Sequence, residues 1–104
     1  MTFNDFMIVG ESVKNSADII DKLNNRKPVF SHVLVANNKG NLEVYPSLEF
    51  MQQKLCDLDI DIVAIFKSED EALEFVRTLC DISLKRFGKI ELISALPFYE
   101  EEVM

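Results

Sequence analysis

Residues 60–88 read IDIVAIFKSEDEALEFVRTLCDISLKRFG, and this stretch decides the fold because a strand pattern runs directly into a helix pattern. The run at 60–66 is the most apolar in the chain, which predicts a buried strand. Ser68 and Glu71 have the Ser-x-x-Glu spacing of a capping box, so we expect the helix to begin there. Gly88 follows the last apolar residue and is placed to end the helix.

The predicted helix over 68–88 is amphipathic. Its apolar residues recur at intervals of three and four, as on one face of a helix. Carboxylates occupy its first turn and basic residues its last, which suits the helix dipole. The residues expected to face the core are Ala72, Phe75, Val76, Leu79, Ser83 and Phe87.

Shorter patterns predict the other elements. Runs of β-branched and other apolar residues, bounded by turn formers, indicate strands. Helical spacing of apolar residues after a possible capping residue indicates helices. The predicted elements are strands at 6–9, 29–36, 41–45 and 89–96, a hairpin turn at 37–40, and helices after Ser12 and Ser47.

These elements together predict an α+β protein. Up to residue 66 their order is that of a ferredoxin-like βαββαβ sandwich, and a C-terminal helix and strand extend it to about five strands and three helices. The strand at 89–96 is expected to run parallel to 60–66, because a long helix connects them. Residues 1–98 are expected to form one domain, and 99–104 an acidic C-terminal tail.

The strands at 29–36, 60–66 and 90–96 are apolar on both alternating faces. A sheet covered by helices on one side only shows polar residues on the other. Two explanations follow: helices cover both faces, or the open face packs against another subunit. We predict self-association, as a homodimer.

Charge and composition exclude several classes of function. The chain has 104 residues and a net charge of −7, and the second half carries six basic against twelve acidic residues. Such a balance argues against nucleic acids and anionic membranes, where Lys and Arg supply the affinity. The first residues show no secretory pattern, and only two cysteines occur, so we expect a cytoplasmic protein.

Several groups of residues resemble reactive sites without meeting their requirements. Asp57, Asp59 and Asp61 alternate with apolar residues at the start of a strand, and a calcium loop from Asp57 would lack its glycine and final glutamate. His32 is the only histidine, and nothing local pairs it with Cys56 or Cys80. No glycine-rich phosphate loop occurs. We predict no catalytic residue, no metal and no cofactor, and hence no enzyme.

Acidic residues are expected to gather at the edge of the sheet where parallel strands end. Such edges commonly bind ligands, and carboxylates there favour a cationic one. The predicted partner-binding residues are Glu69, Asp70, Glu71, Glu100, Glu101 and Glu102. The competing interpretation is that the first three stabilise their helix and that the tail aids solubility.

Two functions fit this pattern. The first is a small acidic regulator or inhibitor, not an enzyme, that binds a basic surface of another protein. The alternative is a dimeric domain that senses a small ligand. The first predicts binding that weakens steeply with salt, because exposed charges are screened.

Overall fold

The computed structural model describes residues 1–11, 13–25, 27, 31–36, 42–52 and 59–103, and it confirms the α+β class. The predicted hairpin turn at 37–40 and the cap at Ser12 lie outside the described residues. The elements follow in the order β1 (Thr2–Val9), α1 (Ser16–Asn24), β2 (His32–Ala36), β3 (Leu42–Pro46), α2 (Ser47–Gln52), β4 (Asp61–Phe66), α3 (Glu69–Phe87), α4 (Leu92–Ala95), the 3₁₀ turn η2 (Leu96–Phe98) and α5 (Tyr99–Val103).

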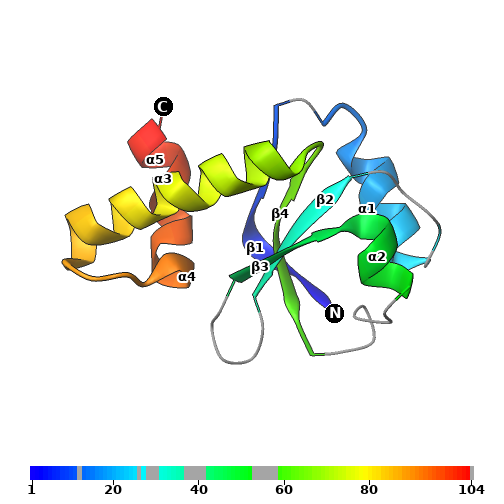
Figure 1. Ribbon diagram of the computed structural model, residues 1–104, viewed down its shortest axis with the longest axis horizontal. Helices are drawn as coiled ribbons and strands as arrows, with labels where there is room; N and C mark the ends of the chain where they lie inside the picture. The colour runs from blue at the N-terminus through cyan, green and yellow to red at the C-terminus, as the bar shows by residue number, and fades with distance from the viewer. Residues whose placement is uncertain (12, 26, 28–30, 37–41, 53–58, 104) are drawn as a thin grey trace.

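The strands form one mixed, four-stranded sheet in the order β1-β4-β2-β3 (Figure 1). β1 and β4 are parallel, while β2 is antiparallel to both β4 and β3. The parallel neighbour of β4 is therefore the first strand of the chain. The ferredoxin-like sandwich with about five strands is not confirmed.

The predicted strand at 89–96 is wrong. Residues 92–95 form α4, and η2 and α5 continue the chain to residue 103. Leu92, Leu96 and Tyr99 are spaced by four and three residues, which is helical spacing and outweighs the short alternation that suggested a strand. Ser83 fixes the turn before α4: its Oγ donates to the Lys89 carbonyl and accepts from the Glu91 N–H, each at 2.6 Å.

Helices cover both faces of the sheet, which is the first of the two explanations for its apolar strands. α1 and α2 pack on one face through a cluster that includes Leu23 and Phe50, and α3 and α4 pack on the other. Figure 1 shows the two groups of helices on opposite sides of the strands. Leu34 pairs with Ala64 but Val35 with Ile62, so β4 has one extra residue there.

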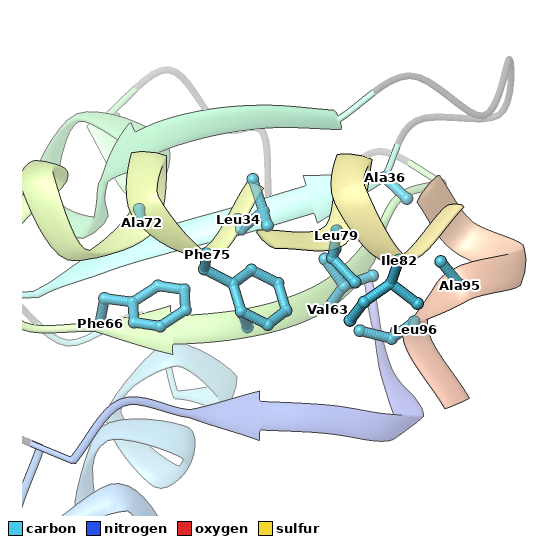
Figure 2. Packing of buried hydrophobic residues seen from close by; sticks show 11 residues of the cluster. Leu34, Ala36, Val63, Phe66, Ala72, Phe75, Leu79, Ile82, Ala95 and Leu96 are labelled. Carbon is cyan, nitrogen blue, oxygen red and sulfur yellow. The ribbon is translucent and has the colours of Figure 1, made fainter. Parts of the chain in front are cut away.

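α3 confirms the predicted ends of the long helix. The Ser68 Oγ accepts from the Glu71 N–H at 3.3 Å, and Gly88 adopts the left-handed conformation with φ 71°. The buried residues of α3 are Ala72, Phe75, Leu79, Ile82 and Ser83, and Figure 2 shows four of them facing β2, β4 and the C-terminal elements. Val76 is half-buried and packs against this core, whereas Phe87 is 37% exposed, so only Phe87 was wrongly placed there.

Candidate functional site: an acidic groove

A groove of about 500 Å³ lies between the end of β1 and the N-terminal half of α3, and α5 closes one side. It is at the carboxyl ends of the parallel strands β1 and β4, where ligands commonly bind. Its described lining residues are Ile8, Val9, Gly10, Glu11, Phe66, Glu71, Glu74, Phe75, Thr78, Tyr99 and Glu100. We call this the acidic groove.

Three aromatic rings, tilted relative to one another, form the base of the acidic groove. Phe66 ends β4, and its ring centroid is 5.2 Å from that of Phe75 on α3 (Figure 2). The Phe75 ring is in turn 4.6 Å from that of Tyr99, the first residue of α5. Phe66 and Phe75 are almost fully buried, so the base of the groove is apolar.

Gly10 allows the chain to pass close to this base. Its N–H donates to the Ile65 carbonyl at 2.8 Å, which holds the end of β1 against β4. A Cβ at position 10 would lie 2.8 Å from Phe66 Cδ1 and 3.0 Å from Glu71 Oε2. A side chain at this position would therefore fill part of the groove.

Four glutamates from three separate segments line the groove: Glu11 after β1, Glu71 and Glu74 on α3, and Glu100 on α5. None of the described lining residues is a Lys, Arg or His. Glu74 makes an ion pair with Arg77 that is long, at 4.0 Å, and exposed, and Glu71 also interacts with another group. The groove thus has an apolar base and a formal charge of −4 around it.

The pKa of Tyr99 reports this environment. Burial of its ring raises the pKa of the hydroxyl above 10.0, and the negative charge of Glu11 raises it further. Both effects disfavour the ionised tyrosinate, and they would disfavour an anionic ligand in the groove for the same reasons. A cation would instead gain from the carboxylates while its apolar part contacts the rings.

The structure separates the six residues predicted to bind a partner. Glu71 and Glu100 line the groove, while Glu69 and Asp70 are exposed in the first turn of α3 outside its lining. The last two, Glu101 and Glu102, follow Glu100 in α5 and contact the C-terminal part of α3.

At that end the carboxylates meet basic residues. The Lys85 Nζ donates to Glu102 at 2.9 Å, and Arg86 is 2.9 Å from Glu102 and 3.2 Å from Glu101. The hydrogen bond from Lys85 lowers the pKa of Glu102 below its ordinary value. The expectation that all six carboxylates share one edge is therefore wrong in its geometry, because it relied on a strand at 89–96. Partner binding itself stays a prediction.

Glu11 and Glu74 line the groove but were not among the residues predicted from the sequence. Glu11 directly follows the glycine that ends β1, and Glu74 lies one turn after Glu71 on the same side of α3. The signal for Glu74 was its spacing of three residues from Glu71. Glu11 could have been found only by knowing that β1 lies beside β4.

The other candidate residues have structural contacts. Asp61 accepts from the Thr2 hydroxyl at 2.6 Å and from the Asn4 amide at 2.7 Å, so it fastens β1 to β4. His32 Nδ1 is 3.4 Å from the Lys67 carbonyl. Asp57 and Cys56 lie outside the described residues. Within the described ranges, no three residues of the types His, Cys, Asp and Glu gather as a metal site.

Comparisons with models of protein families, with curated protein sequences and with solved structures give no match to this chain. The described helices include none with the length and apolar character needed to cross a membrane. The structure places the chain in the α+β class, with a mixed four-stranded sheet. Because a fold alone does not determine function, the function is inferred from the acidic groove.

Proposed function

We propose that this chain is a small acidic binding protein, and that its acidic groove receives a Lys or Arg side chain from a basic surface of another protein. The observation that carries the proposal is the convergence of four glutamates from distant segments on one aromatic base. The acidic first turn of α3 alone would not supply this aromatic base.

The chemistry of a basic side chain matches both parts of the groove. Its aliphatic stem can contact Phe75 and Tyr99, while its charged head approaches the carboxylates around them. A cation above an aromatic ring also gains about 0.5–2 kcal/mol from the ring quadrupole.

A pair of matched amino-acid probes tests the site. N-acetyl-lysine amide and N-acetyl-norleucine amide differ in the ammonium group, so NMR titration separates charge from apolar contact. We expect saturable shifts at Gly10, Glu11 and Tyr99 with the lysine probe and weaker ones with norleucine. Addition of the lysine probe should also lower the pKa of the Tyr99 hydroxyl, because a nearby cation favours the tyrosinate.

Two double variants of α3, each lacking two negative charges, test whether the probe binds in the groove or responds only to the net charge of the helix. E71Q/E74Q removes two charges within the groove, and E69Q/D70N removes two in the same helix outside it. At about 150 mM salt, where the Debye length is ~8 Å, we expect only the first variant to weaken the lysine probe, by about tenfold. Equal losses in both variants would refute binding in the groove.

A small-ligand-sensing domain is the second candidate function. The groove volume of about 500 Å³ favours it, since small-molecule sites span roughly 300–1,000 Å³. Purification from the native cell separates the two candidates. A basic protein that co-purifies with the wild type and is lost with E71Q/E74Q supports the first, whereas a small amine recovered by mass spectrometry supports the second.

A further inference from the structure

A line of apolar side chains runs along α3 on the side away from the acidic groove. Successive residues of a helix are rotated by about 100°, so Leu73, Val76, Cys80, Leu84 and Phe87 all lie within about 40° of one line along α3. We call these residues the α3 stripe. By the same rotation, the groove residues Glu71, Glu74 and Thr78 lie about 120–180° away.

The α3 stripe is partly exposed to water, although Val76 packs against the core and the Phe87 ring centroid is 6.2 Å from that of Phe98. Leu73 and Leu84 are 52% and 51% exposed, and Phe87 is 37% exposed. Val76 and the free thiol of Cys80 are half-buried. Single exposed apolar residues are ordinary, but here three exposed and two half-buried ones lie in line at intervals of three and four, the pattern with which helices pack on one another.

The stripe is symmetric about its centre. Its intervals are three, four, four and three residues, so they are the same in both directions from Cys80. If two copies of α3 pack antiparallel about a two-fold axis at Cys80, Leu73 of one lies opposite Phe87 of the other. Val76 then lies opposite Leu84, and the two Cys80 residues face each other. Such a self-complementary surface is what a two-fold dimer requires.

Charges beside the stripe are complementary in the same arrangement. Arg77 and Asp81 lie on one side of the stripe, about 60° and 100° around the helix from Cys80. In an antiparallel pair, Arg77 comes within about 3 Å, measured along the axis, of Asp81 of the second copy. The Arg77 side chain is 78% exposed and Asp81 is also exposed, so both can form these two symmetric ion pairs.

We propose that two copies of this chain associate through their α3 stripes, packed antiparallel about a two-fold axis at Cys80. A second copy is the fitting occupant because the apolar spacing and the flanking charges each match themselves under that symmetry. The faces of the sheet are already packed by helices, so the interface lies on α3 rather than on an open sheet face. The acidic groove lies on another side of α3 and stays open in both copies.

Sedimentation equilibrium between about 5 and about 200 µM measures the association. We expect a dimer that L84K converts to a monomer. L48K is the matched control, since Leu48 is a 36% exposed leucine on α2, away from the stripe. A monomeric wild type over this range, or a dimer that L84K leaves unchanged, overturns the proposal.

Charge reversal tests the register of the two helices. R77D places two acidic residues opposite each other, and D81R two basic ones, so each should weaken the dimer by about tenfold. The double variant R77D/D81R restores opposite charges across the interface and should recover the association. Absence of recovery would show that the two helices do not pack in this register.

Disulfide formation tests the position of the axis. In C56S, Cys80 is the only thiol, and diamide oxidises two Cys80 thiols to one disulfide while taking up two electrons and two protons. We expect a rapid product of about twice the 11.9 kDa chain mass. The control C56S/C80S/T78C carries its thiol on the groove side and should react much more slowly. Equal rates would contradict an axis at Cys80.

Discussion

Glutamates lie beside both ends of α3, but their surroundings differ. At the N-terminal end, glutamates from α3, the β1 end and α5 surround an aromatic base with no Lys, Arg or His among its described lining residues. Toward the C-terminal end, Glu101 and Glu102, which follow the groove residue Glu100 in α5, bind Lys85 and Arg86. The stem of Arg86 also places its guanidinium 4.0 Å from the Phe98 ring centroid.

This difference shows why acidic runs in a sequence are poor guides to function. Residues 69–71 and 100–102 look equivalent as triplets, yet each triplet is divided in the structure. Only one glutamate of each triplet lines the acidic groove. Glu101 and Glu102 form ion pairs that join α5 to α3, whereas none of the described lining residues of the acidic groove is basic.

The largest expected effect is at the aromatic base of the N-terminal end. F75A removes a ring that is 3% exposed and contacts both Phe66 and Tyr99, so it should lower the free energy of unfolding by about 3–5 kcal/mol. F87A, at the other end of α3, removes a ring that is 37% exposed and should cost clearly less. Urea unfolding followed by circular dichroism measures both, and similar losses would contradict the burial assigned to Phe75.

Two glycines, one near each end of α3, allow a second test. G10A forces a Cβ against the buried Phe66 ring, so we expect a loss of about 1–3 kcal/mol. G88A places a side chain in open space but at φ 71°, and should cost about 1 kcal/mol from backbone strain alone.

Binding separates these two variants more sharply than stability does. G10A should weaken the N-acetyl-lysine amide probe in NMR titration, because the added methyl and the displaced Glu71 carboxylate occupy the groove. G88A should bind like the wild type. If both variants bind equally well, the groove is not the site of the probe.

The ends of α3, residues 89–96 and the acidic groove differ in how far the sequence predicts them. The ends of α3 were predictable because Ser68, Glu71 and Gly88 act within one turn of chain. The strand at 89–96 was mispredicted because apolar residues there alternate for a few positions, while the helical spacing becomes clear only when Tyr99 is included. The acidic groove was half predictable: Glu71 and Glu100 came from charge runs, but Glu11 joins them only through the pairing of β1 with β4.

The cap at the N-terminal end gives a smaller effect. S68A removes the oxygen that accepts from the Glu71 N–H and should cost about 1 kcal/mol. S68D keeps an acceptor at the cap and adds a favourable charge at the helix N-terminus, so it should retain most of the stability. Thermal unfolding of both variants measures this, and a loss in S68D as large as that in S68A would contradict a capping role.

The smallest effect is expected for Glu102, at the compensated end. Its pKa is lowered by the hydrogen bond from Lys85 and by Arg86, so its ionised form is stabilised in the folded state. That contribution is present above the ordinary pKa of about 4.5 and is lost as the pH falls through the lower folded value. E102Q should therefore melt slightly below the wild type at pH 7, and the difference should shrink as the pH falls below about 4. E100Q, whose carboxylate belongs to the groove, provides the matched control and should not show this loss. A wild-type advantage over E102Q that grows toward acid would mean that the ion pairs with α3 do not hold α5 in place.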